Sequence, residues 1–313
     1  MSMTLALHTL SAAMTTNKTR MAEKAHEVAT GRPKDLARSL GANLQTYTNI
    51  GAEVSRNTSL STVTAQASLK FDAQSSALER FFQPIQALTE RMIAQRSAPG
   101  EANGAFLDMT SALNTAYAGQ SLFSGTSTDR PAIGDPAALL AGAKAVFAAA
   151  ADTASGVDAV LDFFRSDTGG YASSVVATLP TSGEVVGAAF TQSRLATALD
   201  PALRTGLAGA ALAAIAKDTG SGEVARSAMQ TLTQASGEGV ELRARIGTQS
   251  AHLDRAAQNF TAQAEAGVMD QKRMEGIDPY QSAVELIQLQ TQAEQIYLMT
   301  ARLSKLSLVN YLR

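Results

Sequence analysis

The sequence predicts a mainly α protein: an elongated antiparallel helical rod built from both chain halves, with paired terminal helices and a small mixed α/β insert domain. Apolar residues recur in heptad spacing near both chain ends and along two long central segments, which is the pattern of helices that pair. Charged residues are only 17% and aromatic residues only 5% of the 313 residues. This composition favours a helical bundle or a polymer subunit over an enzyme.

The composition also excludes several classes of partner. The net charge of −2 argues against nucleic-acid binding, which needs a basic face. The absence of cysteine excludes disulfides, thiolate metal sites and cysteine nucleophiles. The first 20 residues lack the pattern of a secretory signal peptide, and the longest apolar stretch, Ala137–Ala151, contains Lys144 and is too short to span a bilayer. We expect no nucleic-acid partner and no membrane insertion.

The two ends of the chain carry the clearest helical patterns. The N-terminal pattern ends at Thr30-Gly31-Arg32-Pro33, and the C-terminal helix begins at Asp278-Pro279, a cap followed by a first-turn proline. The N-terminal heptad positions are Met3, Leu7, Leu10, Met14, Asn17, Met21, Lys24 and Val28. One face of the C-terminal helix carries Leu286, Leu289, Ala293, Ile296, Met299, Leu303 and Leu306.

The C-terminal helix is apolar on more than one side, because Val284, Ile287, Leu308, Val309 and Leu312 point away from that face. Such a helix is normally buried on more than one side. We therefore expect the terminal helices to be loose in the monomer and to become ordered on assembly.

Two further patterns fill the middle of the chain. One runs from Tyr47 to Met92, with a kink or short break expected near Phe81–Pro84, and a shorter helix follows at about 102–118. The returning pattern runs from Ala225 to Ala264 and the helix ends at about Met269. We expect a terminal domain of 1–42 and 273–313, a rod domain of 43–125 and 206–272, and an insert domain of 126–205.

The insert departs from the heptad pattern. A helix is predicted over Pro136–Arg165, and another starts at Asp200-Pro201 and runs through Lys217. Between them, Val175–Leu179 and Glu184–Phe190 read as the two strands of a hairpin.

No motif in the chain points to catalysis. Gly220–Ala225 fits a dinucleotide-binding glycine pattern, but a predicted helix precedes it where a strand is required. His8, His26 and His252 lie on different helices, and no Gly-x-Ser-x-Gly nucleophile turn occurs. We expect no catalytic residues, no cofactor, no metal site and no enzymatic activity. A cytosolic helical binding module remains an alternative from the pattern alone.

Three local stretches resemble the flagellin family. Arg243–Leu253 is similar to the family's R-x-x-(L/I)-G-(A/T)-x-x-x-x-L run. The ending Leu303–Leu312 and the element Tyr117–Thr126 are most like the family's hook-associated proteins of type 3, which stand at the hook–filament junction. Val28–Ala37 departs from the family's usual acidic stretch after the first helix. The resemblance covers about 1–125 and 220–313.

This resemblance implies a structural subunit of the bacterial flagellum, an adaptor at the hook–filament junction, with flagellin as the alternative within the family. It implies as partners other copies in a ring, a neighbouring hook-associated protein, flagellin and a cytosolic export chaperone. The location would be the extracellular flagellum, reached through type III export without a cleaved signal peptide. The assembly interface would include Met3, Leu7, Leu10, Met14, Met21, Val28, Leu289, Ile296, Met299, Leu303 and Leu306. The chaperone contacts would be Leu303, Leu306, Leu308 and Leu312.

Overall fold

The computed structural model describes residues 3–94, 101–176 and 195–311, and side chains over 8–94, 101–176 and 195–302. About 82% of the chain is helical, which confirms the predicted mainly α class. The chain divides into two compact units, Met1–Leu60 with Asn259–Arg313, and Ser61–Gln258. The elements in order are α1 (Met3–Thr30), α2 (Leu36–Leu40), η1 (Gly41–Asn43), α3 (Leu44–Ile93), α4 (Glu101–Leu113), β1 (Ala116–Tyr117), β2 (Gln120–Ser121), α5 (Pro136–Ala148), α6 (Thr153–Arg165), α7 (Gly170–Ser174), α9 (Pro201–Thr219), α10 (Gly222–Glu275) and α11 (Pro279–Tyr311).

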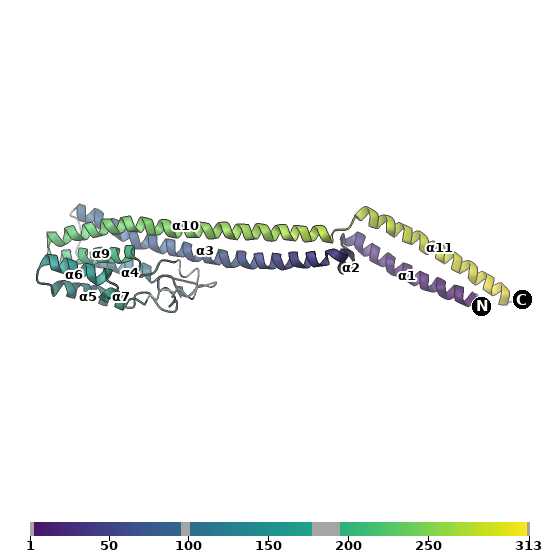
Figure 1. Ribbon diagram of the computed structural model, residues 1–313, viewed down its shortest axis with the longest axis horizontal. Helices are drawn as coiled ribbons and strands as arrows, with labels where there is room; N and C mark the ends of the chain where they lie inside the picture. Colours follow the sequence, from purple (N-terminus) through teal and green to yellow (C-terminus); the bar gives the residue numbers. More distant parts are fainter. Residues whose placement is uncertain (1–2, 95–100, 177–194, 312–313) are drawn as a thin grey trace. The chain divides into compact units, whose positions relative to one another are not determined.

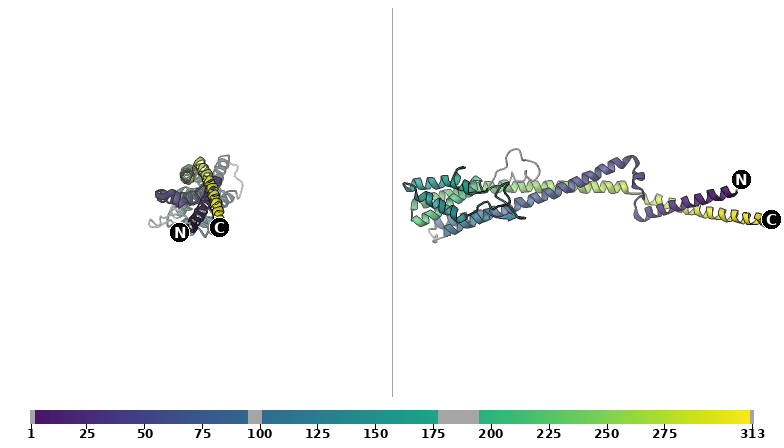
Figure 2. Two further views of the ribbon diagram at one scale, coloured as in Figure 1. Left: turned by 90° about the vertical axis from the view of Figure 1, so that its right-hand side faces the viewer. Right: turned by 90° about the horizontal axis from the view of Figure 1, so that it is seen from below.

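In the first unit, α1 and α11 lie side by side and antiparallel, with the two chain ends at the same end of the pair (Figures 1 and 2). The predicted capping of α11 is confirmed, since Asp278 Oδ1 accepts the backbone N–H groups of Tyr280 at 2.9 Å and Gln281 at 3.2 Å. Gly31, with φ of 70°, takes the left-handed conformation that closes α1.

The start of α3 and the end of α10 also belong to this unit. The Tyr47 hydroxyl donates a hydrogen bond of 2.6 Å to Glu275 Oε1. Gly267 lets the two helices approach closely, because a Cβ there would lie 2.5 Å from Val54 Cγ2. The pairing of α3 with α10 thus has both polar and steric determinants.

Both long central patterns are confirmed by burial. Each of the predicted heptad positions between Tyr47 and Met92 is buried or half-buried, and the same holds between Ala225 and Ala264. The heptad spacing therefore identified the faces by which α3 and α10 pair.

The second unit contains the main apolar core, where α4, α5, α6, α7 and α9 pack together with parts of α3 and α10. Gln74 is fully buried, its Nε2 donates a hydrogen bond of 2.7 Å to the Ala196 carbonyl, and its Oε1 accepts one of 2.9 Å from the Ala196 N–H. Asn114 pairs with Ile133 in the same two-sided way, at 2.8 Å for each bond. These amide side chains satisfy backbone groups of Ala196 and Ile133, which lie outside the helices. The largest fully buried side chains include Phe71, Phe81, Phe106, Phe123, Phe164 and Tyr171.

Of the kink or short break predicted near Phe81–Pro84, the break is wrong, because α3 continues without interruption through Pro84 to Ile93. Proline removes one helical hydrogen bond, at a cost of about 3 kcal/mol. Phe81, Phe82 and Ile85 around it are all buried, and each contributes roughly 1.5–3 kcal/mol, so packing outweighs the loss.

Two helix boundaries were also wrong. The predicted helix Pro136–Arg165 is two helices, because Asp152 accepts the Ser155 N–H at 2.8 Å and caps the start of α6. The helix predicted to reach residue 118 ends at Leu113, because β1 and β2 form a hairpin whose turn residues, Ala118 and Gly119, have positive φ.

The remaining predictions are mixed. The helix predicted to begin at Pro201 is confirmed as α9, and α10 runs beyond Met269 to Glu275. The strand hairpin predicted within 175–190 lies mostly outside the described residues. Within the part of the insert that is described, Val175 forms an isolated bridge with Ile133.

Candidate assembly surface

The α1–α11 pair is the candidate site, because it contains the residues predicted for assembly. Leu10, Met14 and Met21 lie on the half-buried side of α1, and Leu289 and Ile296 lie on the half-buried side of α11. These residues thus line the seam within the pair. Val28 and Met299 are exposed, at 38% and 58%. The side chains of Met3, Leu7, Leu303, Leu306, Leu308 and Leu312 lie outside the described residues.

A polar residue occupies the centre of this seam. Asn17 is 6% exposed, and its Nδ2 donates a long hydrogen bond of 3.4 Å to Gln292 Oε1. Its Oδ1 is buried without a hydrogen-bond partner. A buried asparagine in a helical seam fixes the register of the helices at a cost in stability.

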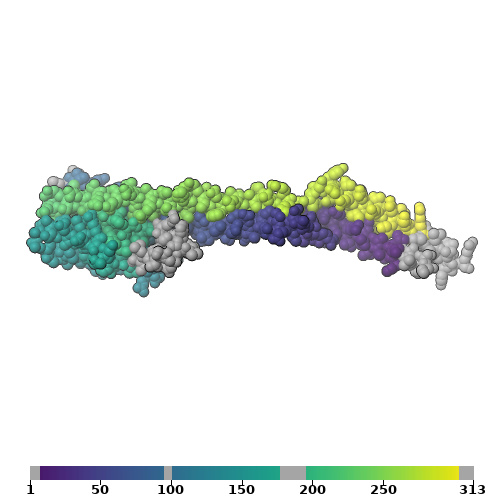
Figure 3. Space-filling view, viewed as in Figure 1, coloured from purple at the N-terminus to yellow at the C-terminus, as the bar shows by residue number. Residues whose placement is uncertain are grey.

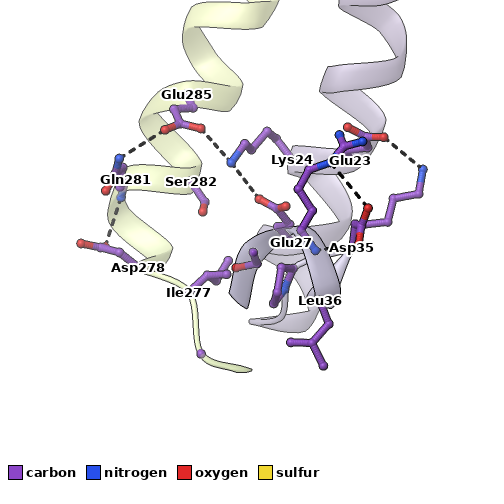
Figure 4. Close-up of a pocket in the computed structure, with 15 residues that line it drawn as sticks. Glu23, Lys24, Glu27, Asp35, Leu36, Ile277, Asp278, Gln281, Ser282 and Glu285 are labelled. Carbon is purple, nitrogen blue, oxygen red and sulfur yellow. Dashed lines mark hydrogen bonds and ion pairs between the residues drawn. The ribbon is translucent and has the colours of Figure 1, made fainter. Parts of the chain in front are cut away.

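A charged cluster lies where α1 ends and α11 begins (Figure 4). Lys24 Nζ lies 2.9 Å from Glu27 Oε2 and 2.8 Å from Glu285 Oε2, so it bridges the two helices. The hydrogen bond to Glu285, and then that to Glu27, raises the pKa of Lys24. The hydrogen bond and charge of Lys24 lower the pKa of Glu285.

This cluster lines a pocket of about 800 Å³. Lys34 Nζ stands 3.6 Å from Glu23 Oε1 on its wall, and Arg38 Nε stands 3.6 Å from Asp35 Oδ2. Because each of these cations already faces a carboxylate, the pocket offers no basic surface to a ligand. It is explained as the space where the chain turns between α1 and α2.

The described part of the α1–α11 pair has no apolar core of its own. Among the side chains described in α1 and α11, only Asn17 and Ser282 are buried, and both are polar. By contrast, the second unit buries whole aromatic rings. Two helices without a buried apolar side chain have a small driving force for pairing.

Large apolar side chains instead cover the outward side of α11. Tyr280 is 80%, Ile287 61% and Leu298 62% exposed, and Tyr297 and Met299 are also exposed. In the space-filling view, the yellow α11 and the purple α1 touch along the pair (Figure 3). An exposed group of large apolar residues on one helix marks an interaction surface.

The predicted list of assembly residues missed most of this outward side. It named Met299 but omitted Tyr280, Ile287, Tyr297 and Leu298. The signal was present in the sequence, since α11 is apolar on more than one side and α1 can cover only one of them.

Over the described residues, no cluster of three or more histidine, cysteine or acidic side chains could hold a metal ion. Over the same residues, no helix has the length and apolar content required to cross a membrane.

Comparison with known families gives this surface a context. Residues 228–312 match the family described as the bacterial flagellin C-terminal helical region, and this stretch includes most of α10 and all of α11. The match supports the flagellin family and indicates a structural subunit that polymerises into a flagellar assembly outside the cell. A search of curated proteins found no match to the chain.

Proposed function

We propose that this flagellar structural subunit is an adaptor at the hook–filament junction, which joins neighbouring copies through the α1–α11 pair. The observation that carries the proposal is the contrast within that pair. Its seam buries no apolar side chain among those described, while the outward side of α11 exposes several large ones.

Assembly would resolve this contrast. Burial of side chains such as Ile287 and Leu298 against another copy stabilises the contact by roughly 1.5–3 kcal/mol each. The same burial would stabilise the pair itself, because a partner that binds only the folded pair shifts the equilibrium toward it. The terminal pair then orders fully only inside the assembly.

The partners follow from this role. The proposed neighbours are copies of the chain in a ring, a hook-associated protein and flagellin. We propose that an export chaperone binds the C-terminal helix before export through the flagellar apparatus. The proposed contacts are Leu303, Leu306, Leu308 and Leu312.

The position at the junction rests on the ending Leu303–Leu312 and on the element Tyr117–Thr126, which resemble junction members of the family. The second candidate is a filament subunit, which the flagellin description of the matched region favours. Copy number separates the two, because a junction protein forms one thin ring whereas a filament subunit forms the whole length of the filament.

Labelled-antibody electron microscopy of isolated flagella tests the position directly. The proposal predicts label in a single narrow band between hook and filament. Label along the whole filament would assign the chain as the filament subunit, and flagella without label would contradict both roles.

Deletion of 280–313 tests the route of assembly. We expect the shortened chain to be absent from flagella while its far-ultraviolet circular dichroism still shows the helices of the second unit, whose core lies within 61–258. Incorporation at the normal level would show that α11 is not the assembly element.

A further inference from the structure

A second polar cluster lies between α3 and α10 in the unit 61–258. Ser68 Oγ of α3 donates a hydrogen bond of 2.5 Å to Asp254 Oδ1 of α10, and Ser250 Oγ of α10 donates one of 2.6 Å to Asp72 Oδ1 of α3. The two serines are 3% and 7% exposed, whereas both aspartates are exposed. We name these four residues the Ser–Asp clasp.

The clasp has a simple sequence basis. Each helix supplies the pattern Ser-x-x-x-Asp, at 68–72 and at 250–254. Residues four apart lie one turn apart on the same side of a helix. In an antiparallel pair, each serine therefore stands opposite the aspartate of the other helix, and the two bonds form together only at one register.

The hydroxyl protons of the clasp are fully committed. Each serine hydroxyl has one proton, and each donates it in a hydrogen bond to a carboxylate oxygen of the opposite helix. The contact of 3.3 Å between Ser68 Oγ and Ser250 Oγ is therefore not a third hydrogen bond in this arrangement. Bonds to an ionised carboxylate are about twice as strong as bonds between neutral groups.

The helix section beside the clasp buries few large apolar side chains. Between 61 and 68 the buried or half-buried positions of α3 are Ser61, Thr64, Ala67 and Ser68. Between 250 and 258 of α10, Leu253 is the large apolar side chain in the seam, and it is half-buried. The large buried side chains of the core begin at Phe71, which lies between Ser68 and Asp72, and at Ile246, one turn before Ser250, and both are fully buried.

We propose that the clasp is a conformational latch, which keeps the section formed by 61–68 and 250–258 closed and sets how readily that section opens while the aromatic core stays folded. The free energy of opening a section of a helix pair depends on the interactions that break within that section alone. Here those interactions include the two charge-assisted bonds and, beside them, the Ser61 Oγ bond of 3.2 Å to the Ala257 carbonyl. This inference does not depend on the role in the flagellum, because it concerns the single chain.

Amide hydrogen exchange of the whole purified chain tests the latch. In the double variant Ser68→Ala/Ser250→Ala, we expect amides of 61–68 and 250–258 to exchange at least about tenfold faster, while amides of 77–85 keep their rates. Each single variant, which removes one bond and leaves the other, should give a smaller acceleration in the same two segments. If the double variant does not fold, the exchange rates of the single variants in these two segments still test the latch.

Thr248→Ala is the matched control. Thr248 lies on α10 close to Ser250, but its exposed hydroxyl bonds only the Ala244 carbonyl of its own helix. Acceleration confined to the two segments in the clasp variants and absent in the control supports the latch. Unchanged exchange, equal acceleration in the control, or acceleration that extends equally into 77–85 would overturn it.

Discussion

Two glycines of α10, two residues apart, show how local space decides the effect of a side chain. A Cβ at Gly239 would lie 2.4 Å from Phe82 Cε1, whereas a Cβ at Gly237 would meet nothing within 4 Å. Gly239 is thus required for the packing of α10 on Phe82, and Gly237 is only a weak point in the helix.

Alanine substitutions at these positions should therefore have opposite signs. Gly239→Ala should lower the free energy of unfolding by about 1–3 kcal/mol through overpacking against the ring. Gly237→Ala should raise it by about 0.5–1 kcal/mol, because alanine favours the helix. Chemical denaturation followed by circular dichroism measures both, and destabilisation by both variants would show that the helix here tolerates no Cβ at all.

At the scale of single residues, the sequence predicted burial well and hydrogen-bond partners poorly. Ser68 and Ser250 fall at heptad spacing within the patterns Tyr47–Met92 and Ala225–Ala264, and both are buried. The spacing could not show that Asp254 and Asp72 would accept hydrogen bonds from these two hydroxyl groups. Each bond joins residues about 180 positions apart, and only the folded helices define the register that brings them together.

Among the elements, the α1–α11 pair combines a weak apolar seam with a charged contact at Lys24. The pKa of Glu285 is lowered, so its stabilising contribution is present at neutral pH and is lost as the pH falls through that lowered value. The pKa of Lys24 is raised, so its contribution is lost only as the pH rises through that raised value. The contact between Lys24 and Glu285 is therefore fully formed at pH values between these two pKa values.

We expect Glu285→Gln to remove the acid-dependent part of this contribution. At low salt the effect at neutral pH should be at most about 1 kcal/mol, because both partners are partly exposed. The pH dependence of thermal unfolding, compared between the natural chain and the variant, measures the difference. Parallel curves from neutral to acid pH would mean that Lys24 and Glu285 do not interact appreciably in solution.

The helices themselves could be predicted from the sequence because their heptads, caps and terminating glycines all agree. The elements that failed did so where a local signal competed with packing. Pro84 predicted a break, but three buried neighbours keep α3 continuous. The uniform alanine content of 136–165 concealed the boundary that Asp152 imposes, and the turn at Ala118 carries a residue that rarely takes a positive φ.

At the scale of the whole molecule, the two units differ in the interactions that stabilise each of them internally. The unit 61–258 has a continuous aromatic and aliphatic core, whereas the described side chains of α1 and α11 bury no apolar group. The sequence predicted three domains, and its patterns could not show how little apolar surface the described part of the α1–α11 pair would bury.

Limited proteolysis of the isolated chain should reveal this difference. Because the described side chains of α1 and α11 bury no apolar group, we expect rapid trimming at both ends to a resistant product of about 40–272. Mass spectrometry of the digest gives the boundaries. Ends that resist cleavage as long as the core does would instead fit a self-sufficient helical binding module.

The proposed role requires that the outward apolar side of α11 join this chain to its neighbours in the flagellum. The variant Ile287→Ser/Leu298→Ser removes two of its most exposed side chains, and Gln288→Ser/Gln295→Ser is the matched control on exposed polar positions of the same helix. Quantitative immunoblotting of purified flagella measures incorporation of each chain. We expect normal incorporation of the control and loss of the apolar variant, with both equally folded and equally abundant in the cell; equal incorporation of the two variants would exclude the outward side of α11 as the contact between subunits.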